Sequence, residues 1–208
     1  MPTPAVPVSQ SERAALADLL EQLGPDQPTV CTGWTTRDLA THLVVRDRRL
    51  DAMPGLALGG RLASWTERVH ARARSRGYAE LLAELRAGPP SWLPTAWSPL
   101  DRVLNTAEFV IHHEDARRAQ PDWAPRELPR EVQDRLWRTV PVLARGRTAP
   151  RPDGGLFVRR SDVPDGSPGS ERRLRDGEPT TTVTGAPLEV LLWVSGRADV
   201  ACVDLTVD

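Results

Sequence analysis

The sequence predicts an α+β protein, with a helical bundle over residues 1–147 and a small α+β domain over residues 148–208. Two observations lead to this fold class. Apolar residues recur at helical spacing through most of the first 145 residues, and from about residue 148 short β-branched runs alternate with turn-rich segments. The length of 208 residues suits one domain with an appendage or two small domains.

Capping signals predict where the first two helices begin. Ser9 and Glu12 have the spacing of a capping box, before a helix that Gly24 is expected to end. Thr35 is expected to cap a second helix, with Asp38 at its third position. These caps set the direction in which the segment TTRDLATHLVVRDRRL enters the bundle.

Three further helical segments complete the predicted bundle. They cover residues 61–87, 101–118 and 130–145. The first is expected to break or bend near Gly77, and Pro141 is expected to bend or shorten the last. Residues 1–145 are therefore predicted to form four or five packed helices.

The C-terminal part has the pattern of a small mixed unit. Strands are expected at 155–160, 180–185 and 200–207, a short apolar helix at 187–197, and turns over 161–179. Nothing in this part has catalytic spacing. We expect it to serve structure, docking or homodimerisation.

Composition excludes several classes of function. The formal net charge is −1, which argues against a generic nucleic-acid binder. No apolar run is long enough to span a bilayer, and the N-terminal sequence has no signal-peptide core. We therefore expect a cytoplasmic protein without membrane or nucleic-acid partners. The two cysteines, Cys31 and Cys202, have no CxxC spacing and are expected to be ordinary reduced thiols, a reactive Cys31 being the less favoured alternative.

The most informative stretch is DRVLNTAEFVIHHEDARR, residues 101–118. Wound as a helix, it aligns a narrow polar stripe of Asp101, Asn105, Glu108, His112 and Asp115. Apolar residues flank this stripe on both sides, whereas the polar face of an ordinary amphipathic helix faces water. Carboxylates and imidazoles held between apolar residues are usually paired or bound to metal. Glu108 and His112, four residues apart, therefore form a candidate pair of ligands.

A third ligand has to come from another segment. The chain has four histidines, and His113, which is turned about 100° away from the stripe, is expected at the surface, with a contact to a ligand or substrate as the alternative. His70 lies in the arginine-rich run ERVHARARSR, which is typical of a water-facing surface. His42 lies beside the apolar stripe of its own amphipathic helix and is the better candidate.

Three segments together resemble a known family. GWTTRDLATHL, followed by EFVIHHEDARR and later by TTVTGAPLEVLLWVSGR, is similar to the actinobacterial mycothiol-dependent maleylpyruvate isomerase family, within the wider DinB-like metal-binding four-helix superfamily. The resemblance implies metal ligands at His42, Glu108 and His112, the trio also reached from helix geometry. It further implies a divalent ion, usually zinc, with open positions for water or substrate, and use of a low-molecular-weight thiol.

Two imidazoles and one carboxylate leave coordination positions open, which favours a catalytic over a sealed structural site. Zn²⁺ is the preferred ion, with Fe²⁺ or Ni²⁺ as alternatives. The resemblance implies mycothiol as a co-substrate. Asn105 and Asp115 are candidates to orient the ligands. Arg46 is a weaker catalytic candidate that would meet a substrate carboxylate; the simpler interpretation is an exposed arginine in an arginine-rich run.

The function expected from these residues is a metal-dependent, thiol-using transferase or isomerase acting on a small electrophilic substrate. The first alternative is a non-catalytic metal-binding, sensor or interaction protein, which a saturated coordination shell would favour. The second is a metal-dependent hydrolase or Fe²⁺ enzyme. For the trio itself, the alternative to a metal site is a buried hydrogen-bonded cluster.

Overall fold

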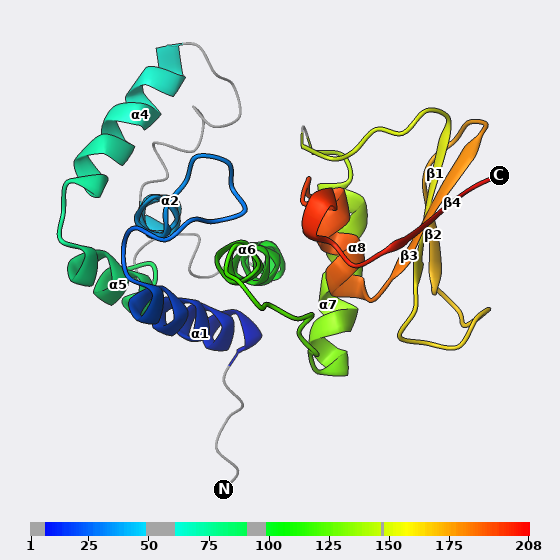
Figure 1. Cartoon of the computed structure of the whole chain (residues 1–208), viewed down its shortest axis with the longest axis horizontal. Coiled ribbons are helices and arrows are strands. Elements are labelled where there is room, and N and C mark those ends of the chain that lie inside the picture. The colour runs from blue at the N-terminus through cyan, green and yellow to red at the C-terminus, as the bar shows by residue number, and fades with distance from the viewer. Residues whose placement is uncertain (1–6, 49–60, 91–98, 147) are drawn as a thin grey trace, which may run out of the picture. The chain divides into compact units, whose positions relative to one another are not determined.

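The computed structural model describes residues 7–48, 61–90, 99–146 and 148–208, with the side chains of 61–64, 66 and 99–105 outside the description (Figure 1). Contacts within the chain divide it into two compact units, Met1–Trp123 and Ala124–Asp208. The described part contains seven α-helices and one four-stranded sheet, which confirms the mixed α+β class. The DinB-like four-helix arrangement stays a prediction.

The first unit is helical. Its helices are α1 (Val8–Leu23), α2 (Thr36–Arg48), α4 (Arg61–Arg74), α5 (Tyr78–Ala87) and α6 (Pro99–Arg117). Helix α1 packs against α5 and α6, and α2 packs against α4 and α5. The shared core is built from leucines of α1, α2 and α5 together with one aromatic ring of α6: Leu16, Leu20, Leu39, Leu43, Leu81, Leu82, Leu85 and Phe109.

The cap of α2 is confirmed and that of α1 is wrong. The backbone N–H of Thr35 donates to Asp38 Oδ2 over 3.0 Å, and the Asp38 N–H lies 3.4 Å from Thr35 Oγ1, as in a capping box. Helix α1 instead begins after Pro7, so Ser9 lies inside it. The partner expected for Ser9, Glu12, turns to another helix, as described below. The breaks at Gly24 and near Gly77 are confirmed.

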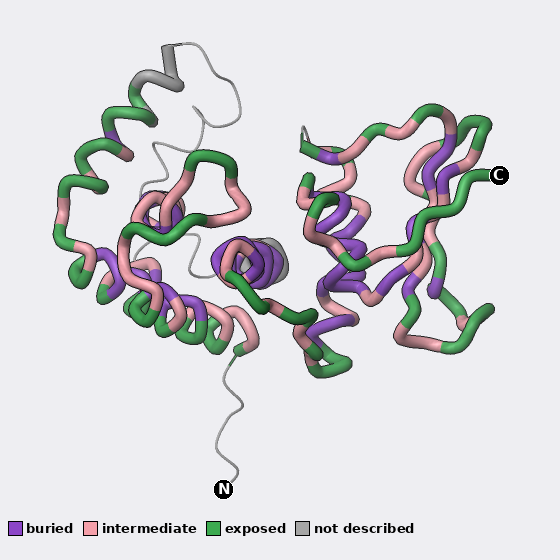
Figure 2. Tube along the Cα trace, in the orientation of Figure 1, coloured by how far each residue is buried: buried purple, intermediate pink, exposed green. Residues whose placement is uncertain are grey.

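The second unit combines α7 (Arg130–Leu143), β1 (Gly155–Arg160), β2 (Glu171–Arg175), β3 (Thr180–Gly185), α8 (Pro187–Val194), η3 (Ala198–Val200) and β4 (Asp204–Val207). The strand order is β2-β1-β3-β4; β1 and β3 are parallel and the outer pairs antiparallel. Helix α8 packs on α7, β1 and β3 and is buried along its whole length (Figure 2).

Strand β2 was not predicted, because its segment was expected to be turns. Its sequence ERRLR is charged, and none of its side chains is fully buried. Such a strand is typical of a sheet edge, where the backbone pairs on one side only and the side chains stay in water. Segment 171–175 is therefore a strand because its backbone pairs with β1. Its sequence shows no alternation of apolar and polar residues that would predict a strand.

The division between the units differs from the predicted boundary at residue 147. It falls between Trp123 and Ala124, so α7 belongs to the C-terminal unit. The physical reason is packing. Helix α7 has a buried face that includes Leu136 and Val140, and α7 packs against α8. Helical periodicity shows that a helix has a buried face but does not show which element covers it.

Within the described residues, the helices are too short or too polar to cross a membrane.

Candidate metal centre

Helix α6 is buried on both sides of its polar stripe. Phe109 and Ala116 are fully buried in the core of the first unit, and Val110 and Ile111 are buried on the other side of the stripe (Figure 2). Apolar residues therefore flank the polar stripe on both sides, as predicted. Glu108 keeps 32 % of its side chain exposed, and His112 keeps 8 %. Among the stripe residues whose side chains are described (Glu108, His112 and Asp115), Glu108 is thus the one that reaches solvent.

The structure brings His42, Glu108 and His112 together from α2 and α6. One ligand atom from each lies within 4.8 Å of the other two, so the three residues can hold a metal ion. The Nε2 atom of His112 is 3.5 Å from Glu108 Oε2, and the ring centres of His42 and His112 are 5.2 Å apart. Ligand atoms at roughly 2.1 Å from a tetrahedral zinc ion lie roughly 3.4 Å apart, and two imidazole ligands have ring centres roughly 5 Å apart. The trio fits such an ion.

Asp115 supports His112 from the next turn of α6. Its Oδ2 is 2.9 Å from His112 Nδ1 and accepts from Nδ1–H, while Nε2 faces Glu108 and can donate to it; loss of the Nε2 proton would free that lone pair for a metal ion. This carboxylate–histidine arrangement is common behind metal ligands. Burial acts to lower the pKa of His112, but hydrogen bonds to Asp115, Cys31 and Glu108 outweigh it and hold the pKa well above its usual value. His112 is thus the most strongly hydrogen-bonded member of the trio.

The other two members have complementary electrostatics. Burial and the neighbouring His112 lower the pKa of His42 to about 3, so its imidazole is neutral and its lone pair is available. Burial alone would raise the pKa of Glu108, but its hydrogen bond to His112 and the charge of Arg46 lower it to about 2. A neutral imidazole beside an ionised carboxylate is a suitable ligand set for a divalent cation.

Arg46 lies beside the trio, one turn after His42. Its Nε is 3.5 Å from Glu108 Oε2, and only 14 % of its side chain is exposed. The interpretation of Arg46 as an exposed arginine is therefore wrong. Its guanidinium borders the open side of Glu108, where it can meet an anionic group of a ligand. Asn105 was also expected near the ligands, but its side chain lies outside the described residues.

Cys31 reaches the centre from the turn before α2. This turn is closed by the Pro28–Thr35 bridge and by the Trp34 N–H donating to the Cys31 carbonyl, with Gly33 at a φ of 78°. The Cys31 Sγ is 3.2 Å from Asp115 Oδ2. Cys31, His112 and Asp115 form a second group with ligand atoms within 4.8 Å of one another. Sequence reasoning favoured an ordinary thiol, and only the loop position just before α2 hinted otherwise.

His70 is not the water-facing residue that its arginine-rich run suggested. Its ring stacks on that of His42 at 6.0 Å between centres, and its Nε2 is buried with no hydrogen-bond partner in the described part of the chain. Burial lowers its pKa. His70 and Trp34 also line a cavity of about 570 Å³ beside His42. Helix α4 thus supplies a fourth imidazole near the trio, which sequence reasoning missed.

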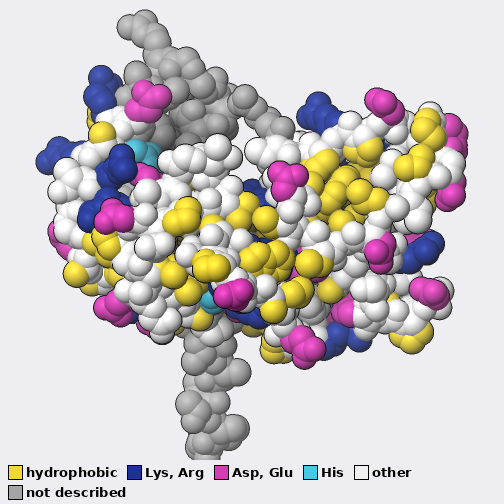
Figure 3. Space-filling model, in the orientation of Figure 1, with side chains coloured by type: hydrophobic (Ala, Val, Ile, Leu, Met, Phe, Trp, Pro, Cys, Tyr) yellow, Lys and Arg dark blue, Asp and Glu magenta, His cyan; other side chains and the backbone are white. Residues whose placement is uncertain are grey.

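His113 also differs from the expected surface residue. It is 7 % exposed, and its Nδ1 is 3.3 Å from Glu12 Oε2 on α1. This contact uses the carboxylate that was expected to cap α1. The histidines of this unit are mostly interior, and Figure 3 accordingly shows little histidine surface among the arginine, aspartate and glutamate side chains.

The centre therefore offers two groups of ligands around one imidazole: His42 and Glu108 on the Nε2 side of His112, and Asp115 and Cys31 on the Nδ1 side. A divalent ion in the first group has room for further ligands. Comparison of the chain with protein-family models, with curated proteins and with solved structures finds no match.

Proposed function

We propose that the protein binds one divalent ion, Zn²⁺ by preference, through His42, Glu108 and His112, and uses it as a transferase or isomerase that joins a low-molecular-weight thiol to a small electrophile. The observation that carries the proposal is the approach of these three ligand atoms, from two helices, to within 4.8 Å of one another. The resemblance to the mycothiol-dependent maleylpyruvate isomerase family supports mycothiol as the thiol and a DinB-like arrangement of the helices.

The residues around the trio have complementary tasks in this proposal. Asp115 fixes the tautomer and orientation of His112 through Nδ1. Arg46 partly neutralises Glu108 and is available to a carboxylate of the substrate or thiol. A divalent ion held there supplies Lewis acidity and lowers the pKa of a bound thiol, so that a thiolate is available near neutral pH. The cavity beside His42 and His70 provides space for a small substrate.

The Cys31, His112 and Asp115 group supports a second arrangement, in which the ion lies on the Nδ1 side of His112. In that arrangement the Cys31 thiolate would be a metal ligand, which favours a non-catalytic metal-binding protein. The trio is preferred because the Nδ1 side of His112 is already occupied by a 2.9 Å hydrogen bond to Asp115. The two arrangements share His112, and only the second has a sulfur ligand, which spectroscopy detects.

Elemental analysis of untagged protein tests the proposal. We expect about one equivalent of metal in the wild type and almost none in His42→Ala or His112→Ala. His113→Gln is the matched control, because it changes the adjacent buried histidine without touching the trio. Full metal content in both alanine variants would refute the assignment.

Cobalt substitution then tests the use of a thiol. Addition of a low-molecular-weight thiol to the Co²⁺ protein is expected to produce sulfur-to-cobalt charge-transfer absorption that is absent before addition. A spectrum that no thiol changes would favour the metal-binding alternative. Charge-transfer absorption before any thiol is added would favour Cys31 as a ligand.

A further inference from the structure

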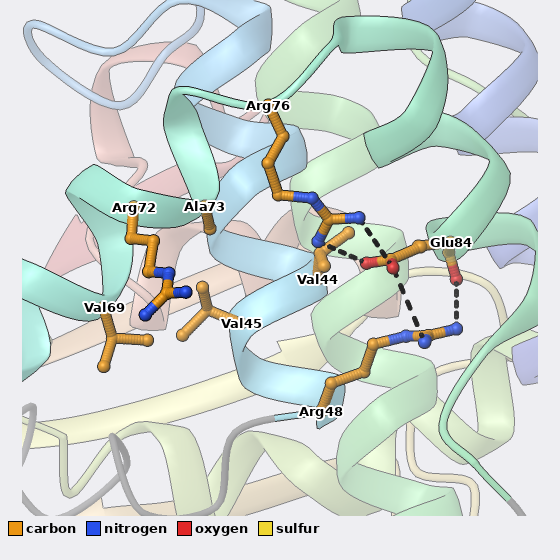
Figure 4. Close-up of a pocket in the computed structure, with 8 residues that line it drawn as sticks. All are labelled: Val44, Val45, Arg48, Val69, Arg72, Ala73, Arg76 and Glu84. Atoms are coloured by element: carbon orange, nitrogen blue, oxygen red, sulfur yellow. Dashed lines mark hydrogen bonds and ion pairs between the residues drawn. The ribbon is translucent and has the colours of Figure 1, made fainter.

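A separate cavity of the first unit lies between α2, α4 and α5 (Figure 4). Its volume is about 240 Å³. One side is apolar and consists of Val44, Val45, Val69 and Ala73; the other lining residues are Arg48, Arg72, Arg76 and Glu84. This cavity shares no lining residue with the trio or with the cavity that His70 and Trp34 line beside His42, so it is a separate site.

The charges around this cavity do not balance. Glu84 supplies the one carboxylate of the lining, and Arg76 holds it by two hydrogen bonds of 2.7 and 2.9 Å. Arg48 Nη1 lies 3.7 Å from the same carboxylate (Figure 4). The hydrogen bond from Arg76 lowers the pKa of Glu84, so this carboxylate is ionised, and both of its oxygens are already paired with arginine. Arg76 is also paired with Glu80, which lies outside the lining, so among the described residues Arg72 is the lining guanidinium without a carboxylate partner.

Two of these arginines retain unused donors within the described part of the chain. Arg48 Nε is buried without a hydrogen-bond partner, although Nη2 donates to the carbonyl of Gly88 over 3.1 Å. Arg72 is an exposed residue without an ion pair in that part of the chain, and its guanidinium turns toward Val45 and Val69 (Figure 4). The cost of a buried donor without an acceptor applies to Arg48 Nε, whereas the guanidinium of Arg72 at the mouth of the cavity can bind a carboxylate by charge-assisted hydrogen bonds.

We infer that this cavity binds a short-chain carboxylic acid as its anion, with the carboxylate toward Arg72 and the hydrocarbon chain against Val44, Val45 and Val69. The apolar side of the cavity favours a hydrocarbon chain, and the arginine side favours an anionic group. An inorganic anion would leave the valines without a partner, and a neutral alcohol would leave the guanidinium groups without a counter-charge. The cavity is smaller than the roughly 300–1,000 Å³ of drug-sized sites, which favours a chain of about six carbons.

Isothermal titration calorimetry of the full chain with hexanoate tests this inference. We expect saturable binding of hexanoate, at least tenfold weaker binding of hexanol and of inorganic phosphate, and loss of affinity as salt increases. Arg72→Gln is expected to weaken hexanoate binding by about tenfold, the size of one charge-assisted contact.

Arg68→Gln is the matched control. It removes the same charge from α4 one turn earlier, where Arg68 lies over the Trp65 ring and outside the cavity lining. Hexanoate affinity is expected to stay within about twofold in this variant, because a remote exposed charge contributes little. Absence of hexanoate binding at millimolar concentration, equal binding of hexanol or phosphate, or equal affinities of the two variants would each overturn the inference.

Discussion

The two units of the chain use their buried polar side chains differently. In the C-terminal unit several of these side chains bind backbone groups, whereas Arg160 pairs with Asp134 and Asp162. Gln133 Oε1 accepts the Leu188 N–H over 3.0 Å, Glu189 Oε2 accepts the Cys202 N–H over 2.8 Å, and Trp137 Nε1 donates to the Gly169 carbonyl over 2.8 Å. Each contact fastens one element to another.

In the N-terminal unit, Thr36 and Thr41 also donate to backbone carbonyls, but a group of buried polar side chains gathers at one point. Glu108, His112 and Asp115 follow one helix stripe, and His42 and Cys31 approach the same imidazole from other segments. Side chains that satisfy backbone groups complete a fold, whereas side chains gathered at one point retain lone pairs for a ligand. The difference predicts that polar substitutions in the first unit affect metal binding and those in the second affect stability.

Glu108→Gln should have the largest effect. Removing the charged ligand of the trio is expected to weaken metal binding by more than about 100-fold, because even changes behind the ligands typically cost roughly 10–100-fold. A competition titration with a chromophoric chelator measures this affinity. The free energy of unfolding without metal should change little. An unchanged metal affinity would remove Glu108 from the site.

Asp115→Asn comes next. The variant keeps the shape of the side chain but loses the negative charge that holds Nδ1–H of His112, so metal affinity should fall by about 10–100-fold. The same titration measures it. A loss larger than that of Glu108→Gln would reverse the order and shift the ion to the Cys31 and Asp115 side.

Gln133→Ala tests the second unit. The substitution leaves the N–H of Leu188, at the start of α8, without its acceptor in a buried position, and should lower the free energy of unfolding by about 1–3 kcal/mol. Urea denaturation followed by tryptophan fluorescence measures this loss. Metal content per folded protein should equal that of the wild type. A parallel loss of metal would contradict the expectation that polar substitutions in the second unit affect stability alone.

Cys31→Ser should have the smallest effect. If the trio holds the ion, metal affinity should stay within about threefold, because the hydroxyl can still meet Asp115 as the thiol does. The chelator titration and the Co²⁺ spectrum together measure the outcome. Loss of the metal in this variant would show that the native thiol is a ligand.

Much of the fold was predictable because its signals are local. The Thr35–Asp38 cap, the breaks at Gly24 and near Gly77, and the strands at 155–160 and 180–185 each depend on residues a few positions apart. Strand β2 was missed because a charged edge strand has no buried face to reveal it.

The candidate site divides in the same way. The sequence by itself determined that Glu108, His112 and Asp115 share one stripe of one helix, since spacing fixes the face of a helix. Only the tertiary structure decided that Cys31 meets Asp115 across 84 residues and that Glu12 meets His113 across 101. It likewise decided that His70 stacks on His42 and that α7 packs on α8. Periodicity states which side chains are buried, and packing between distant segments decides what each of them touches.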